Sequence, residues 1–384
     1  MQTIHVTTIN GSIPIRRRIY WAHQQGCCAP LDAWLGLCER YSRGVREMVC
    51  RVGLDGSYRK AAEDLYRLGQ ITLSYQTLRD LFQREGQKVR TAQQNDELTP
   101  TFTAEDCHVR ADEPTCLITG ADGFQVPRIT DAEQRKRRVK AKQRRHRLRQ
   151  QGHPLRPLPP RPTGADQKWK EAKLVTFYDL SGRYHYTAAT MGNHQALGHL
   201  MRHHAAQLHL DKADCKYSVS DGAEWIRRQY QQQLPMLDAM ILDYYHFRDH
   251  TIHCAQTLFG EGTDAASQWR KAFCTSLIQS GPVAALTELA VLGQTHRGRK
   301  RQTLTALQGY MAHRTDMLDY PRYIAAGYQI GSGPTESQCK GLASRLKGRG
   351  RRWNRRGIHA HLALGCLYGN SRQWTAYWPK VPTP

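Results

Sequence analysis

Residues 328–357 read YQIGSGPTESQCKGLASRLKGRGRRWNRRG, and from residue 330 onward they hold eight Lys and Arg side chains but one acid, Glu336. A Gly-Ser-Gly stretch comes before this acid, and Pro334 stands at a helix-start position, so Glu336 is expected in the first turn of a helix. A basic surface alone needs no carboxylate there. A site that holds a cation against a phosphate needs both, because the carboxylate binds the cation and the Lys and Arg side chains bind the phosphate.

Two further acids follow strand-like stretches. Asp122 comes after CLITGA and Asp221 after CKYSVS, and both precede a glycine. A β-hairpin is predicted around Ser181 and Gly182, and after it helical and strand patterns alternate, which indicates an α/β sheet. Such sheets place their sites at the ends of strands.

Carboxylates that lie together repel one another unless a cation intervenes. Mg²⁺ prefers oxygen ligands, and two such ions can activate an attacking hydroxyl and stabilise a leaving oxygen. Asp122, Asp221 and Glu336 are therefore predicted to hold two Mg²⁺ ions, with Mn²⁺ able to substitute. The alternative is that each Asp-Gly is an ordinary turn and that Glu336 only favours the helix dipole. Asp179, which also ends a strand, is a rival ligand.

The net charge of the 384 residues is +23, which points to a polyanionic partner, and double-stranded DNA is the partner expected. No stretch approaches the roughly 20 apolar residues of a spanning helix, and the N-terminus lacks a signal-peptide core, so we expect a cytoplasmic, nucleoid-associated protein without a membrane partner. The eleven cysteines include no CxxC pair and are expected to be reduced thiols. Cys27 and Cys28, with His23 nearby, are either the remnant of a zinc ribbon in residues 1–56 or packed thiols.

Residues 57–95 predict a DNA-binding unit that is like a helix-turn-helix. Ser57 and Ser74 can each cap a helix, and Gly69 ends the first one. The outward side chains of the second helix would reach bases or phosphates; they are Gln76, Arg79, Gln83 and Arg84. An ordinary helical hairpin with a polar face is the alternative.

The segment 131–165 is a basic arm that contains prolines. Ten Lys and Arg side chains fall between Arg135 and Arg149, so it is expected to be mobile or to form a helix on a polyanion. Its phosphate contacts would include Arg135, Lys136, Arg137 and Arg138. The C-terminal basic set would hold the DNA backbone as well; its members are Lys340, Arg345, Lys347, Arg349, Arg351, Arg352, Trp353, Arg355 and Arg356.

The chain resembles the bacterial ISKra family of insertion-sequence transposases, which belong to the DDE class and are related to the Mutator-like group. The tail around GSGPTESQCK resembles the signature of that family closely, and ADGFQVP, SDGAEWI and ILDYYHFRDH resemble its other blocks. The similarity covers roughly residues 25–90 and 115–375. Two departures are the missing cysteine spacing near residue 27 and the unusually basic arm.

The resemblance implies an RNase H-like catalytic core, formed by residues 112–255 and 322–375 and interrupted by a helical insertion at 256–321. It implies that Asp122, Asp221 and Glu336 are the catalytic, metal-binding acids, and that Asp243 and His246 support the site. It also implies Mg²⁺-dependent cleavage and strand transfer at the ends of a mobile element, by a dimer or higher oligomer on DNA. The alternatives are an inactive, domesticated DNA-binding protein and an RNase H-like nuclease.

Overall fold

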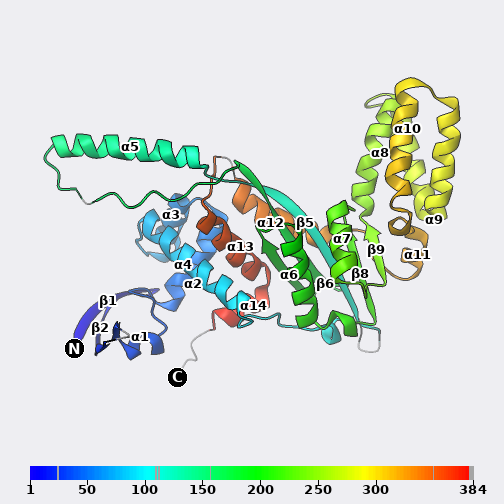
Figure 1. Ribbon diagram of the computed structural model, residues 1–384. Coiled ribbons are helices and arrows are strands. Elements are labelled where there is room, and N and C mark those ends of the chain that lie inside the picture. Colours follow the sequence, from blue (N-terminus) through cyan, green and yellow to red (C-terminus); the bar gives the residue numbers. More distant parts are fainter. Residues whose placement is uncertain (24–25, 109, 111–112, 156, 349, 380–384) are drawn as a thin grey trace. The chain divides into compact units, whose positions relative to one another are not determined.

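The computed structural model describes residues 1–379 except 24–25, 109, 111–112, 156 and 349. The chain forms two compact units. The sheet unit comprises Pro100–Gly123 and Lys173–Cys339; the helical unit comprises Met1–Thr99, Phe124–Ala172 and Lys340–Pro384. Figure 1 colours the elements of both units along the sequence, from blue at the N-terminus to red at the C-terminus.

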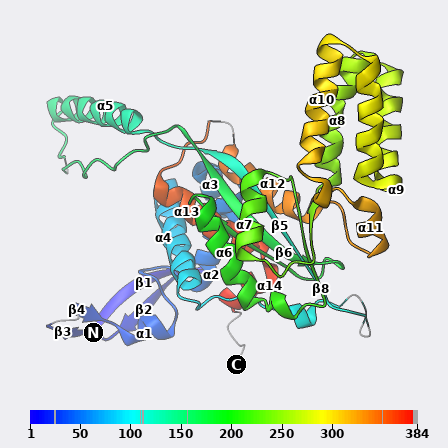
Figure 2. The same cartoon turned by 45° about the vertical axis from the view of Figure 1, so that its right-hand side comes forward.

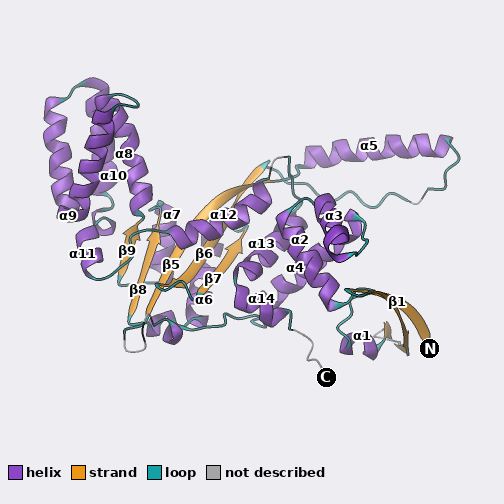
Figure 3. Ribbon diagram, turned by 180° about the vertical axis from the view of Figure 1, so that it is seen from behind, coloured by secondary structure: helices purple, strands orange, loops and turns teal. Residues whose placement is uncertain are grey.

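The sheet unit is built on a five-stranded sheet with the order β7-β6-β5-β8-β9. β6 and β7 pair antiparallel, and β8 pairs parallel with both β5 and β9. The strands, orange in Figure 3, are β5 (Cys116–Pro127), β6 (Trp169–Asp179), β7 (His185–Thr190), β8 (Cys215–Ser220) and β9 (Ala239–Leu242). The predicted hairpin around Ser181 and Gly182 is confirmed, and Gly182 takes a φ of 70° in its turn.

Alternating side chains of the strands bury two separate apolar clusters. Cys116 and Ile118 of β5 join the cluster that includes Phe247, Phe273 and Tyr320. Leu117 and Ala121 point to the opposite face and join the cluster that is completed by helices α6 (His194–Gln207) and α7 (Glu224–Gln233). The sheet is therefore covered on both faces, and Asp122 shares the face of Ile118 by the same alternation.

The helices α8 (Tyr244–Phe259), α9 (Asp264–Thr295) and α10 (Gly298–Ala312) stand side by side as a bundle in Figures 1 and 2. The short α11 (Tyr320–Ala325) follows, and then α12 (Gly333–Lys347). Residues 260–263 form the loop between α8 and α9. Gly281, with a non-helical φ of 79°, kinks α9 directly before Pro282.

The expectation that no segment is long and apolar enough to span a membrane is wrong for α9. Its mean hydropathy reaches 1.2 over a membrane-length window, of which 28% is buried. Gly281 breaks its helical geometry, and Phe273, Leu277, Ala285 and Leu289 are buried in the core of the sheet unit. These contacts are typical of a helix in a folded bundle.

The core of the helical unit is formed by α2 (Arg43–Asp55), α3 (Tyr58–Gly69), α4 (Tyr75–Gln94), α13 (Arg355–Gly369) and α14 (Ser371–Tyr377). The predicted caps are confirmed, since the Ser57 and Ser74 hydroxyls accept hydrogen bonds from the N–H groups of Lys60 and Thr77. α4 and α13 approach so closely that a Cβ at Gly86 would lie 2.5 Å from the Cβ of Ala360. The N-terminal part holds the β1–β2 and β3–β4 hairpins and α1; their bounds are Gln2–Thr8, Gly11–Arg17, Tyr20–Ala22, Gly26–Cys28 and Pro30–Trp34.

The basic arm contains a long helix, α5 (Asp131–Gln150). The Thr130 hydroxyl and the Glu133 carboxylate form a capping box at its start, and acids in its first turn and arginines in its last turn favour the helix dipole. Within residues 131–150, all of which the structure describes, only Gln134 is buried, so the ten cations are held on a helix that has little core of its own.

Candidate active site

The register of the parallel strands brings Asp122 and Asp221 to the same level. Cys116 pairs with Cys215 and Thr119 with Ser218, and the same offset carried along both strands places Asp122 beside Asp221. The strand does not end at Asp122 as predicted, because Phe124 and Val126 continue the buried alternation and β5 runs on to Pro127. β8 does end at Ser220, directly before Asp221.

Glu336 lies in the first turn of α12, as predicted. This turn packs on β5 at Gly120, where any side chain would collide, since a Cβ there would lie 1.9 Å from the Thr335 hydroxyl. The Thr335 hydroxyl is also 2.7 Å from the Thr176 hydroxyl of β6. Gly120 and Asp122 share one face of β5, so the close packing brings the start of α12 to the face that carries Asp122.

The charges of the three predicted acids act on one another. Burial raises the pKa of the Asp122 carboxyl above its ordinary value, and the charges of Asp221 and Glu336 raise it further. Hydrogen bonds from the Cys339 thiol and from the N–H of Gly123 oppose the shift. The structure thus brings Asp122, Asp221 and Glu336 into one electrostatic cluster, which we call the carboxylate corner.

Cys339 was not predicted as part of this corner. It is 7% exposed, and its thiol donates a hydrogen bond to the Asp122 carboxylate. The sequence did hold a signal, because residues three apart on a helix share a face and Cys339 follows Glu336 by three.

Asp243 lies level with Asp221 on the next strand but is engaged differently. Its side chain is buried, at 1% exposure, and accepts hydrogen bonds from the N–H groups of His246 at 2.6 Å and of Ser332 at 2.5 Å. The first bond caps α8 and the second holds the segment before α12. Asp243 therefore braces the helix that carries Glu336, and the neighbouring N–H of Tyr244 donates to the carbonyl of Ile330 at 3.0 Å.

His246 faces another histidine, since its Nε2 lies 3.2 Å from the Nε2 of His250. The pKa of His250 is lowered, first by burial and then by the charges of His246 and Arg314. A metal site at these histidines would need more ligands than this pair.

Asp179, the rival acid, has a structural use. Its carboxylate accepts hydrogen bonds from the Ser181 hydroxyl and from the N–H of Tyr184, at 2.9 Å for the latter. These bonds close the turn between β6 and β7, which explains its burial.

The donor chemistry of the carboxylate corner fits Mg²⁺, because its acids are hard oxygen ligands and the mutual destabilisation of Asp122 calls for a cation. Among the described residues, no three His, Cys, Asp or Glu side chains stand as a ready-made metal-binding group.

The C-terminal basic set contains both exposed side chains and side chains that are buried or paired within the fold. Trp353 is 9% exposed and its indole N–H donates to the carbonyl of Leu346 at 2.8 Å, so its ring is not available to DNA. Arg352 pairs with Glu133, and Arg345 lies over the ring of Tyr368. The exposed members are Lys340, Lys347, Arg352, Arg355 and Arg356, while Arg351 is half-buried and Arg349 lies outside the described residues.

On α4, Gln76 is exposed and Arg79 is half-exposed, with its guanidinium on Asp80 at 2.8 Å. The expectation that Gln83 points outward is wrong: it is 7% exposed, because α13 covers that face of α4. Arg84 pairs with Glu39 at 2.7 Å. In α5, Arg135 pairs with Asp131 and Arg138 with the carbonyl of Pro159, and Lys136 and Arg137 are exposed.

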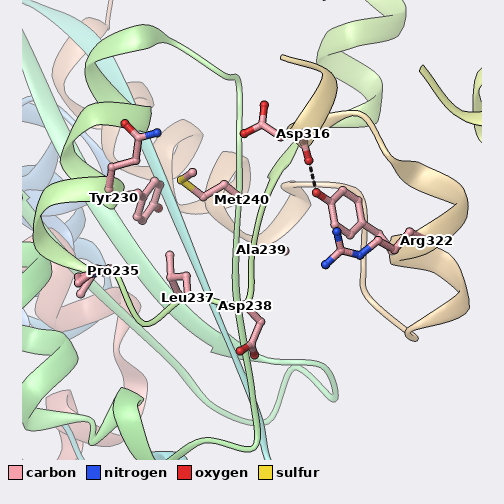
Figure 4. Close-up of a pocket in the computed structure, with 11 residues that line it drawn as sticks. Tyr230, Pro235, Leu237, Asp238, Ala239, Met240, Asp316 and Arg322 are labelled. Atoms are coloured by element: carbon pink, nitrogen blue, oxygen red, sulfur yellow. Dashed lines mark hydrogen bonds between the residues drawn. The ribbon is translucent and has the colours of Figure 1, made fainter. Parts of the chain in front are cut away.

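Cys27 and Cys28 are both exposed, and they belong to no metal-binding group among the residues that the structure describes. A pocket of about 360 Å³ lies elsewhere in the sheet unit, beside β9, with Tyr230, Met240, Asp316 and Arg322 among its lining residues (Figure 4). The three acids of the carboxylate corner are not part of that lining.

Comparison with known proteins gives limited matches. Residues 1–151 match a family model described as an uncharacterised protein family (UPF0236). No curated protein matches the chain. A solved structure titled "Drosophila P element transposase strand transfer complex" aligns with 11% identity over 90% of this chain and 83% of that one, and its TM-score of 0.28 is too low to support a structural argument.

Proposed function

We propose that the protein is a DDE transposase that cuts and joins DNA strands at the carboxylate corner. The observation that carries the proposal is the electrostatic cluster of Asp122, Asp221 and Glu336, three acids from distant parts of the sequence. Carboxylates that lie together repel one another, and a shared cation offsets this electrostatic repulsion.

The topology supports an RNase H-like core. If β5 to β9 are counted as the first to the fifth strand, the order of the strands across the sheet is 3-2-1-4-5. The second and third strands form an antiparallel hairpin, and the first, fourth and fifth are parallel. The three acids come from the first strand, the end of the fourth, and a helix after the fifth.

In the proposed mechanism, Asp122, Asp221 and Glu336 would hold Mg²⁺, which would supply Lewis-acid activation of the attacking oxygen and charge stabilisation at the phosphate. Asp122 and Asp221 present their carboxylates from neighbouring strands, and Asp243 keeps the start of α12 in place. Cys339 orients the Asp122 carboxylate by its hydrogen bond. In the first step water attacks a phosphodiester, whose P–O3′ bond breaks to leave a 3′-hydroxyl on one side and a 5′-phosphate on the other. In the second step that 3′-hydroxyl attacks a phosphodiester of target DNA, which joins the strands and releases the 3′-hydroxyl of the cut target strand.

The cations of the helical unit support DNA as the partner. The net charge of +23 and the ten Lys and Arg side chains of α5 suit a polyanionic partner. Contacts between such side chains and phosphates give an affinity that falls steeply as the salt concentration rises. Binding at the ends of the element and assembly as a dimer or higher oligomer are part of the same proposal.

The test uses labelled duplexes of the DNA that flanks the gene, incubated with Mg²⁺ and with either the protein or its Glu336→Gln variant. Nicking at a fixed position by the first protein only, followed by joined products, is the expected result. Tight binding by both proteins without cleavage by either would instead establish a DNA-binding protein with a silent core. Cleavage without joining would identify a nuclease.

A further inference from the structure

Arg314 lies beside the carboxylate corner although it follows the last helix of the bundle. Its Nε donates a hydrogen bond to the carbonyl of Gly222 at 3.2 Å, and Gly222 is the residue directly after Asp221. A Cβ at Gly222 would lie 3.3 Å from the same Nε, so the approach is close. The helical bundle thus delivers one guanidinium to the turn that carries the second acid.

The guanidinium is held in a fixed orientation. Its Nη1 donates to the carbonyl of Tyr310 at 3.0 Å, and its central carbon lies 4.2 Å from the centre of the Tyr310 ring. His250 stacks on that ring with 4.3 Å between centroids. Asp221 raises the pKa of Tyr310 and Arg314 lowers it, behind the larger effect of burial, so this ring lies within the fields of both charges.

The charge of Arg314 has no counter-ion among the described residues, and its Nη2 has no hydrogen-bond partner there. The nearby Arg227 is different, because its guanidinium pairs with Asp316 at 2.8 Å and donates to the carbonyl of His313. One arginine of this region is therefore neutralised within the fold, while the other keeps its charge and one terminal nitrogen for a ligand.

We propose that Arg314 is a phosphate-binding residue that holds a phosphodiester of the bound DNA strand beside Asp221. This inference rests on the proposed function and adds a substrate contact to it. A cluster of acids repels a phosphodiester, so a fixed guanidinium next to it orients the strand without neutralising the acids. The contact comes from the helical bundle, which gives that insertion a part in substrate binding.

The test neutralises phosphates one at a time. Flank duplexes carry a single uncharged methylphosphonate at each position around the mapped cut, and they are cut by the wild type, by Arg314→Gln and by the control Arg301→Gln. Arg301 is exposed on α10, the helix that ends two residues before Arg314, so the control removes the same charge from a nearby part of the insertion. One methylphosphonate is expected to slow the wild type and the control about ten-fold, the scale of one hydrogen bond to a charged group.

Arg314→Gln is expected to be about ten-fold slower on unmodified DNA and to show no further loss at that one position. Arg314→Lys, which keeps the charge without the planar fork, should recover part of the rate and of the sensitivity. Melting temperatures of the three variants close to that of the wild type establish that the variants are folded. Equal penalties at every position for all four proteins overturn the phosphate site.

A binding series separates this inference from the proposed function. Glu336→Gln protein, alone and combined with Arg314→Gln or Arg301→Gln, is titrated with the same duplexes in Ca²⁺, with the methylphosphonates placed across the bound footprint. Loss of cutting by every protein overturns the proposed function, whereas the binding series still tests Arg314. Identical affinities of the two double variants for every duplex, or no binding at all, overturn the inference.

Discussion

The acids of the carboxylate corner and two other acids of the sheet unit, Asp179 and Asp243, use the same chemical group in different ways. All four aspartates lie in or directly after strands of one sheet. Asp179 and Asp243 give their oxygens to main-chain N–H groups and close a turn or brace a helix. Asp122 also accepts a hydrogen bond from a main-chain N–H, that of Gly123, but the charges of Asp221 and Glu336 act on it as well. The acids that hold a turn or a helix contribute to architecture, whereas the acids that lie against one another are the candidates for chemistry.

The largest expected effect separates the two groups by activity. Asp221→Asn should reduce Mg²⁺-dependent nicking of the flank duplexes by at least about 10³-fold, since it removes a charge that the transition state needs. Its stability should stay near that of the wild type, because the amide can still accept the bond from the Ala223 N–H, which is 2.9 Å long. A variant that cuts at the wild-type rate would remove Asp221 from the corner.

The structural acids should instead be recognised by a loss of stability when they are replaced. Asp243→Ala leaves the N–H groups of His246 and Ser332 without their hydrogen-bond acceptor, so the free energy of unfolding should fall by about 3 kcal/mol. Urea denaturation measures the change. Asp249→Ala, on the exposed side of the same helix, should stay within about 0.5 kcal/mol of the wild type. A similar small change for Asp243→Ala would contradict its bracing role.

The contact between β5 and α12 provides a third prediction. Gly120→Ala places a methyl group against Thr335 and should cost about 2 kcal/mol of stability together with a loss of cutting. Adding Thr335→Ala should recover part of both losses, which a double-mutant cycle would measure. Additive effects of the two changes would mean that the helix is not held at this point.

The smallest effect concerns Asp122 without metal. In EDTA, Asp122→Asn should be slightly more stable than the wild type at neutral pH, because the buried carboxylate is opposed by its neighbours. The folded protein keeps the proton of Asp122 at pH values where the unfolded chain has released it, so the wild type loses stability relative to the variant as the pH rises past the ordinary pKa of 3.8. Thermal melts across this pH range test the sign. Mg²⁺ should raise the melting temperature of the wild type only.

Much of the sheet could be predicted from the sequence because its signals are local. Alternating apolar residues, the turn at Ser181-Gly182 and the serine caps each act over a few residues, and the structure confirms them. The end of β5 was misplaced because Asp-Gly is a turn signal that packing overrides when Phe124 and Val126 are buried.

The candidate site was less accessible to sequence reasoning, because its relations are tertiary. Nothing near Asp243 in the chain indicates that Ser332 will donate to it, and Arg314 is separated from Gly222 by the whole helical bundle. Trp353 and Gln83 were misassigned to the surface because polar and basic neighbours surround them in sequence. In space Trp353 packs against the rings of Tyr58 and His361, and α13 covers the face of α4 that carries Gln83. Only the resemblance of the tail to a known family selected the three acids from several equivalent ones.

The position of Glu336 has a consequence during synthesis. Every strand of the sheet and all of the helical bundle precede α12 in the chain, and its docking place at Gly120 emerges more than half a chain earlier. At translation rates of about 5–20 residues per second, the sheet is exposed for many seconds with two of the three acids and no third. On the proposed assignment, the nascent protein therefore cannot cut the DNA of its own cell until α12 has been synthesised.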